Sequence, residues 1–160
     1  MNFPERVYTA EEVKQANNLV CNGYRHKLTI EGEPEFVKKV NNATELIRIA
    51  GFSDYLTSYI RKIVEIDGIT QLRETEVAIW ANKFAVDNPI DFASLIIQKV
   101  FQMSEYLQGA LYYGGNAEKR SVNKRIEFLQ TLKEKSNDSL VKQECERLLE
   151  MWRDSALSFN

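Results

Sequence analysis

The sequence predicts a helix-rich α+β fold formed by a single domain that spans residues 1–160. Long stretches repeat apolar residues at three-or-four spacing, which is typical of amphipathic helices. Two shorter stretches, residues 58–67 and 76–82, are rich in β-branched and aromatic residues and are predicted to be strands. No repeat, low-complexity tract or Pro/Gly-rich linker divides the chain. We therefore expect a small sheet of short strands packed on a central buried helix, followed by C-terminal helices.

The first elements are a helix, a short strand and a second helix. Thr9 and Glu12 have the spacing of a capping box, in which a hydroxyl and a carboxylate satisfy free backbone donors at a helix start. A short strand is predicted over residues 27–31. The second helix is expected to begin at Pro34, which suits a first helical turn, and to end at Gly51, which can adopt the left-handed conformation.

The predicted fold class depends on whether these two segments are strands. Periodicity alone does not distinguish a short buried strand from a buried helical segment. If residues 58–82 were helical, the chain would be all-α. That fold is the alternative prediction.

The C-terminal half is predicted to contain three helices. Residues 87–89 open a long apolar helix that Gly109 ends, and Asn116 is expected to cap the next helix. Residues 136–138 interrupt the pattern. The last helix, over residues 140–156, has one apolar stripe and a charged outer face, so it is expected either to cap the domain or to form a homodimer, with Trp152 as its anchor.

Composition limits the classes of partner. The formal net charge of -2 argues against a nucleic-acid-binding protein, which normally carries a basic excess. No apolar run approaches the roughly 20 residues that cross a bilayer, and the first residues lack the pattern of a secretory signal. Cys21 and Cys145 are far apart and form no CxxC pair, which favours reduced thiols and a cytoplasmic location. His26, the single histidine, is expected at the surface or in a loop.

The long apolar helix carries one narrow polar stripe. At about 100° per residue, its apolar side chains cover most of the circumference, which is typical of a helix packed on most sides. Such a stripe faces either solvent, at a wet edge, or an internal polar cleft. The stripe is formed by Asp91, Ser94, Gln98, Gln102 and Glu105.

Residues 93–102 of this helix resemble the zinc-binding helix of small zinc metallopeptidases of the gluzincin type. In that family an apolar run leads into HExxH, whose two His bind zinc and whose Glu is the general base. Here Gln98 and Gln102 stand at the two His positions and Lys99 at the Glu position. The third ligand of the family is a Glu on the next helix, and Glu118 matches it, whereas Arg125 departs from the Gln that ends the family's AExxAxxxQ pattern.

The resemblance implies a peptidase-like domain that has lost its metal site. An amide oxygen is a poor zinc ligand, and the Lys99 ammonium would repel a metal ion. We therefore predict a pseudoenzyme, with no metal, cofactor or catalytic residue, that binds a protein or peptide or has a regulatory role. Lys99 is expected to pair with Glu118 or Glu105 in place of the lost cation.

Other interpretations remain open at this point. The chain is alternatively an all-helical protein–protein interaction module. A third possibility is an enzyme that uses the carboxylates of Glu105 and Glu118. The charged cluster of residues 119–125 is interpreted as a solvated face. If a ligand cleft is retained, its lining is predicted to be Ser94, Glu105, Tyr106, Tyr112 and Tyr113.

Overall fold

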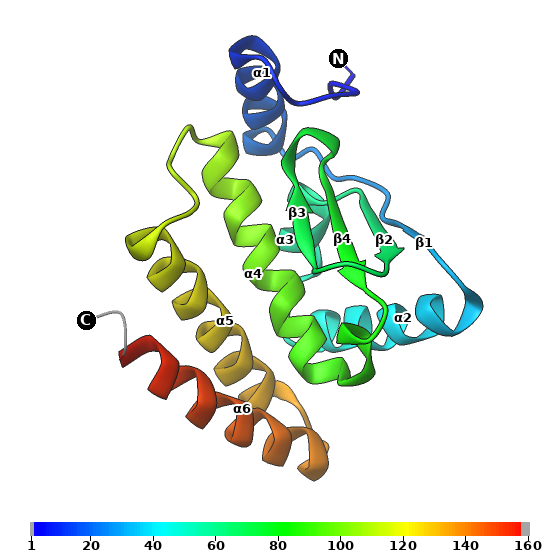
Figure 1. Cartoon of the computed structure of the whole chain (residues 1–160), viewed down its shortest axis with the longest axis vertical. Coiled ribbons are helices and arrows are strands. Elements are labelled where there is room, and N and C mark those ends of the chain that lie inside the picture. The colour runs from blue at the N-terminus through cyan, green and yellow to red at the C-terminus, as the bar shows by residue number, and fades with distance from the viewer. Residues whose placement is uncertain (1, 158–160) are drawn as a thin grey trace.

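The computed structural model describes residues 2–157, which form six α-helices, two 3-10 helices and one four-stranded mixed sheet (Figure 1). The helix-rich α+β prediction is confirmed, and the all-α alternative is wrong. No helix in this part of the chain combines the length and apolar character needed to cross a membrane. The elements in chain order are α1 (Ala10–Cys21), β1 (Thr29–Glu31), α2 (Pro34–Ile49), α3 (Ser53–Tyr59), β2 (Lys62–Ile66), β3 (Gln71–Arg73), η1 (Glu74–Glu76), β4 (Ala78–Asn82), η2 (Ala85–Asp87), α4 (Pro89–Leu107), α5 (Gly115–Lys135) and α6 (Ser139–Leu157).

The sheet is mostly parallel and has the strand order β1-β2-β4-β3. β1, β2 and β4 are parallel, and β3 pairs antiparallel with β4 at one edge. Successive side chains point to opposite faces, so one face is apolar and joins the buried core. The core-facing residues are Ile30, Ile63, Leu72, Ile79 and Ala81.

The other sheet face is not part of the core. Register places Thr29, Lys62 and Ala78 in one row and Val64 beside Trp80 in the next. Apart from Ala78, these side chains are partly or fully exposed. Parallel sheets are normally covered on both faces, so this bare face is unusual for a mostly parallel sheet.

Helix α4 is the central element of the domain, as predicted. Phe92, Ile96, Ile97 and Val100 are fully buried, and α4 lies between the sheet and the two C-terminal helices (Figure 1). Its start is fixed by Asn88, whose Oδ1 accepts the backbone amides of Ile90 and Asp91 at 3.1 Å each.

The expected helix ends are mostly confirmed. Thr9 and Glu12 form the capping box of α1. Gly51 and Gly109 follow α2 and α4 with positive φ angles of 83° and 76°. The expected cap at Asn116 is wrong, because α5 already begins at Gly115, with Gly114 as its N-cap residue.

The boundaries around the sheet differ from the prediction. Residues 58 and 59 end α3 instead of starting a strand, and the Ser58 hydroxyl donates to the backbone carbonyl of Asp54 at 2.6 Å, one helical turn earlier. Strand β3 was not predicted. The second predicted strand begins later than expected, because Val77 has left-handed backbone angles (φ 56°, ψ 43°) between η1 and β4.

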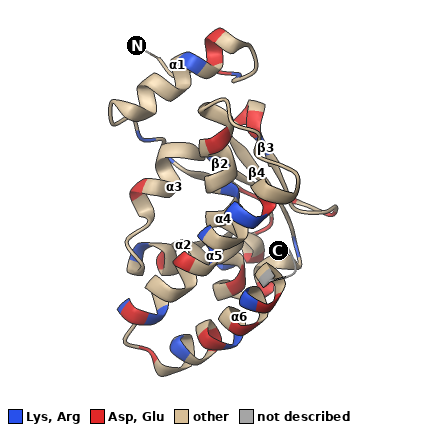
Figure 2. Cartoon of the chain, turned by 90° about the vertical axis from the view of Figure 1, so that its left-hand side faces the viewer, with Lys and Arg blue, Asp and Glu red and all other residues tan. Residues whose placement is uncertain are grey.

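Helices α5 and α6 form a hairpin beside α4 (Figure 1). Leu129, Leu132, Leu148 and Leu149 bury the apolar sides of the two helices. Acidic and basic residues are interspersed along α6 (Figure 2), and Lys133 of α5 pairs with Glu146 of α6 at 2.5 Å. The C-terminal helix thus caps the domain, which was one of its two predicted roles.

Candidate functional site

The polar stripe of α4 is buried beneath α5. Ser94, Gln98, Gln102 and Glu105 are each less than one tenth exposed, and only Asp91 at the first turn is substantially accessible. The interpretation of the stripe as a wet edge is therefore wrong. Asp91, Ser94, Gln98 and the Oε2 atom of Glu105 are instead bonded to side chains of α5.

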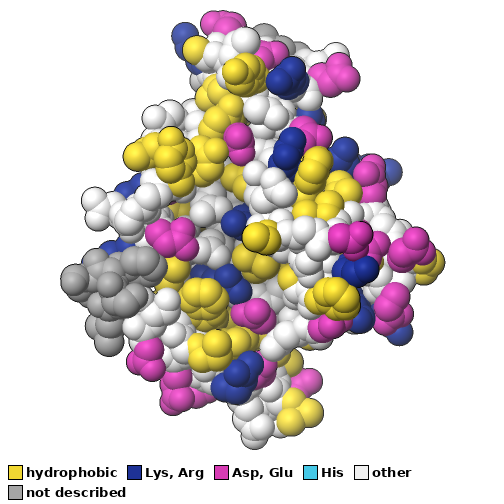
Figure 3. All heavy atoms as spheres, in the orientation of Figure 1, with side chains coloured by type: hydrophobic (Ala, Val, Ile, Leu, Met, Phe, Trp, Pro, Cys, Tyr) yellow, Lys and Arg dark blue, Asp and Glu magenta, His cyan; other side chains and the backbone are white. Residues whose placement is uncertain are grey.

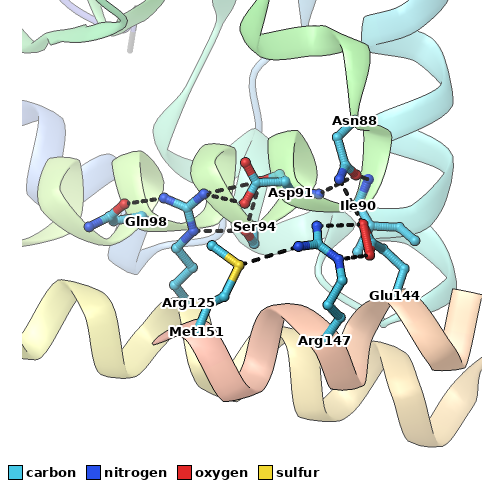
Figure 4. A network of polar contacts seen from close by, with 9 residues as sticks. All are labelled: Asn88, Ile90, Asp91, Ser94, Gln98, Arg125, Glu144, Arg147 and Met151. Atoms are coloured by element: carbon cyan, nitrogen blue, oxygen red, sulfur yellow. Dashed lines mark hydrogen bonds and ion pairs between the residues drawn. The ribbon is translucent and has the colours of Figure 1, made fainter. Parts of the chain in front are cut away.

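Arg125 of α5 fills the first half of the stripe (Figure 4). Its Nε donates to Ser94 Oγ at 2.8 Å, its Nη1 to Gln98 Oε1 at 2.9 Å and its Nη2 to Asp91 Oδ1 at 2.8 Å. The side chain is 5% exposed, so its assignment to a solvated face is wrong. Burial lowers the pKa of Arg125, and the Asp91 carboxylate opposes that shift. The Arg125 guanidinium thus places a positive charge of the protein itself among the polar side chains of the stripe.

Helix α6 covers the remaining side of this cation. The Arg125 guanidinium carbon lies 4.1 Å from the ring centroid of Trp152, in a cation–π contact. Glu144 of α6 accepts a hydrogen bond of 2.8 Å from Asn88 Nδ2 and pairs with Arg147 at 2.5 Å (Figure 4). These contacts tie α6 to the start of α4, and Trp152 anchors this intramolecular packing.

Gln98 also bonds to α5 through its other amide atom. Its Nε2 donates to Ser121 Oγ at 3.0 Å, so both ends of the amide are satisfied. Ser94 faces Arg125, and Gln98 faces Ser121, one turn earlier on α5. This antiparallel register puts Gln102, one turn further along α4, at the level of Glu118. Gln98, Gln102 and Glu118 thus belong to neighbouring turns of two facing helices.

Lys99 does not form the predicted ion pair with Glu105. Glu105 is bound to Arg120, with 2.9 Å between Oε2 and Nε, because α5 brings that guanidinium within reach. Lys99 has no ion pair within residues 2–157. Burial lowers the pKa of Lys99, and the charge of Glu118 raises it in part, so the two groups are near enough to interact through space.

These residues do not suit a zinc ion. Two neutral amides and an ammonium offer no imidazole or thiolate, and a single carboxylate does not hold zinc by itself. No group of three or more His, Cys, Asp or Glu side chains in residues 2–157 is arranged to hold a metal ion. We therefore derive no metal chemistry for this site.

The side chains proposed for a ligand cleft are divided between two places. Ser94 is bonded to Arg125, whereas Tyr106 lies twelve residues, or about 18 Å, further along α4. The Tyr106 hydroxyl donates to the backbone carbonyl of Val7 at 2.7 Å. Tyr106, Tyr112 and Tyr113 form a chain of edge-to-face contacts. Burial and Glu74 raise the pKa of Tyr112 to about 12.

The chain matches no protein-family model, no curated protein and no solved structure.

His26 lies in a loop, as one of its two predicted placements had it, but a surface position is wrong. The side chain is 7% exposed and contacts the rings of Phe3 and Tyr24 at centroid distances of 4.5 and 5.0 Å. Its Nε2 is buried without a hydrogen-bond partner among residues 2–157. Burial, and then the nearby charge of Arg61, lower the pKa of His26 from 6.5 to about 4.

The depressed pKa of His26 predicts a loss of stability in mild acid. The unfolded chain binds a proton near pH 6.5 and the folded chain only near pH 4, so the contribution of His26 is complete above pH 6.5 and is lost as the pH falls toward 4. We expect the urea midpoint of unfolding to decrease less between pH 7 and pH 5 for the His26→Asn variant than for the parent protein. An NMR titration of the single imidazole checks the cause, and a midpoint near 6.5 would contradict it.

Proposed function

We propose that the protein is a metallopeptidase-like domain without catalytic activity, which acts by binding a protein or peptide. The observation that carries this proposal is the bond between Arg125 and Gln98. Gln98 stands at a position where the resembled family has a zinc ligand, and Arg125 holds a permanent positive charge there. Like charges repel strongly in a buried setting, so the fold favours its own cation over a metal ion.

Two further observations support this ancestry. The elements follow the order that the resemblance implies, with a helix and strands first, then α4, a glycine-containing loop and α5. The register of α4 and α5 also brings Gln98, Gln102 and Glu118 to adjacent turns. Catalysis by a pair of carboxylates is less well supported, because Glu105 is already bound to Arg120.

Rebuilding the ancestral ligands tests the proposal. The variant Gln98→His, Lys99→Glu, Gln102→His, Arg125→Gln removes the competing cation as well, and it is expected to bind one zinc ion per chain with Glu118 as the third ligand, because two imidazoles one turn apart on a helix can share a metal. Equilibrium dialysis followed by metal analysis measures the stoichiometry. Adding Glu118→Gln to this variant is the matched control and should weaken zinc binding about tenfold or more. A folded quadruple variant that takes up no zinc would show that these positions do not correspond.

Location and oligomeric state are further parts of the proposal. We propose a cytoplasmic location because Cys21 is exposed and Cys145 buried, and both are free thiols. We also propose a homodimer contact through α6 at Leu140 and Met151, which are exposed, and not at Trp152, which is occupied by Arg125. Light scattering on the purified chain distinguishes a monomer from a dimer.

A further inference from the structure

A groove of about 990 Å³ lies on the bare face of the sheet. Its floor includes Lys62, Arg73 and Trp80 of β2, β3 and β4, and one wall is the N-terminal segment at residues 5 and 6. This volume is at the upper end of the range of small-ligand sites, about 300–1,000 Å³. The groove is thus large enough for several residues of an extended peptide.

The groove is more basic than the chain as a whole. Five cationic side chains line it, against the three carboxylates of Glu5, Glu12 and Glu76, although the net charge of the protein is -2. The cationic side chains are Arg6, Lys27, Arg61, Lys62 and Arg73.

Two of the three carboxylates are already engaged within the fold. Glu12 accepts the backbone amides of Tyr8 and Thr9 at 3.2 and 2.8 Å, as part of the α1 cap. Glu76 pairs with Arg73 at 3.2 Å. Among residues 2–157, no carboxylate forms an ion pair with Lys27, Arg61 or Lys62. Glu5 and Glu76 also act on Arg61 through space, so the excess of cations is carried mainly by Lys27 and Lys62 beside Arg61.

Arg61 stands out among these cations. Its guanidinium donates to the backbone carbonyls of Pro4 and Glu76, each at 3.1 Å, and to that of Glu5. Burial lowers its pKa. A half-buried cation bonded only to neutral carbonyls retains a favourable field for an anion, because burial weakens solvent screening.

The aromatic side chain of the groove favours a peptide over a nucleic acid. The Arg73 guanidinium carbon lies 4.1 Å from the centroid of the Trp80 ring, so one ring face is taken and base stacking is restricted. The cations come from the N-terminal segment, the stretch before β1, the start of β2 and the end of β3, and five separate cations suit several carboxylates better than one phosphate. Hydrophobic side chains form several separate groups on the face shown in Figure 3. Trp80 is the one hydrophobic side chain among the described residues that line the groove, so recognition there depends on charge.

We propose that this groove binds an acidic, extended segment of a partner protein, whose carboxylates pair with Lys27, Arg61 and Lys62. This inference goes beyond the proposed function, and it does not depend on the ancestry of the α4–α5 site. Failure of the zinc test would leave it unchanged.

Fluorescence of Trp80 provides a direct test. Trp80 and Trp152 are the two tryptophans of the chain, so the Trp152→Phe background leaves Trp80 as the only reporter. A short blocked peptide of alternating Glu and Asp should change this fluorescence saturably, and the apparent affinity should fall as salt is raised. A blocked peptide of Lys residues should produce no change.

Charge-reversal variants locate the binding site. Lys27→Glu with Lys62→Glu should weaken binding of the acidic peptide about tenfold or more. Lys38→Glu with Lys135→Glu is the matched control, because both lysines are exposed and lie outside the groove lining. The two double variants change the net charge by the same amount. Urea midpoints verify that both double variants fold.

Three outcomes would overturn the proposal. One is equal loss of affinity in the two double variants, which would show a non-specific charge effect. Another is no saturable response to the acidic peptide at low salt. The third is tighter binding of inorganic phosphate or a single-stranded oligothymidylate than of the peptide, which would assign the groove to another ligand class.

Discussion

Replacement of Arg125 by alanine is expected to lower the free energy of unfolding by about 2–6 kcal/mol, because two buried polar side chains lose their partner at about 1–3 kcal/mol each. The substitution leaves Ser94 and Gln98 without the donor that satisfies them, and it removes the cation that stacks on Trp152. Urea denaturation monitored by circular dichroism measures the loss. The free energy of unfolding of Arg125→Lys should lie between those of the parent protein and Arg125→Ala, because a lysine keeps the charge but lacks the planar set of donors.

A control and a rescue separate this effect from general loss of charge. Arg153→Ala removes an exposed arginine of α6 and should change stability by no more than about 0.5 kcal/mol. Arg125→Met combined with Ser94→Ala and Gln98→Leu should recover part of the loss, because an apolar set leaves fewer buried groups unsatisfied. A cost below about 1 kcal/mol for Arg125→Ala would contradict the central role of this residue.

Phe128→Ala is expected to have a comparable effect, about 3–5 kcal/mol, because it opens a cavity in a close-packed core. Phe128 is fully buried, and its ring meets that of Phe52 edge to face at 5.4 Å. Through this contact, α5 packs against the segment between α2 and α3. The urea midpoint measures the loss.

Phe84→Ala is the matched control for this cavity. Phe84 is 69% exposed, so the same truncation there removes little buried surface and should cost no more than about 0.5 kcal/mol. Equal losses for the two variants would show that the effect of Phe128→Ala does not arise from the core.

The sequence predicted the long elements well because their patterns are local. Helices α1, α2, α4, α5 and α6 have apolar residues at helical spacing, and capping residues or glycines mark several of their ends. The short elements were harder. α3 spans seven residues and β3 only three, so neither provides enough turns or alternations to reveal its period.

The candidate site was predicted in part. The polar stripe follows from helical geometry, but periodicity shows only which residues share a face and not which neighbour covers it. Arg125 is spaced three and four residues from Val122, Phe128 and Leu129, all buried, and that spacing was a signal for its burial. The charges around it favoured the opposite interpretation.

His26 and the sheet groove had no comparable signal. The burial of His26 depends on Phe3 and Tyr24, which precede it in segments without a regular period. The groove joins cations from the N-terminal segment, β2 and β3. Their proximity arises from the strand order, which the amino-acid pattern did not specify.

The bond between Tyr106 and Val7 has a consequence for the order of folding. These residues are 99 positions apart, and the backbone N–H of Val7 also donates a hydrogen bond to the Thr75 carbonyl at 2.9 Å. Contacts between such distant residues carry a high entropic cost of loop closure and form late. The N-terminal segment should therefore dock after α4 has assembled on the sheet, and hydrogen exchange during refolding should protect the Val7 amide later than the amides of α4.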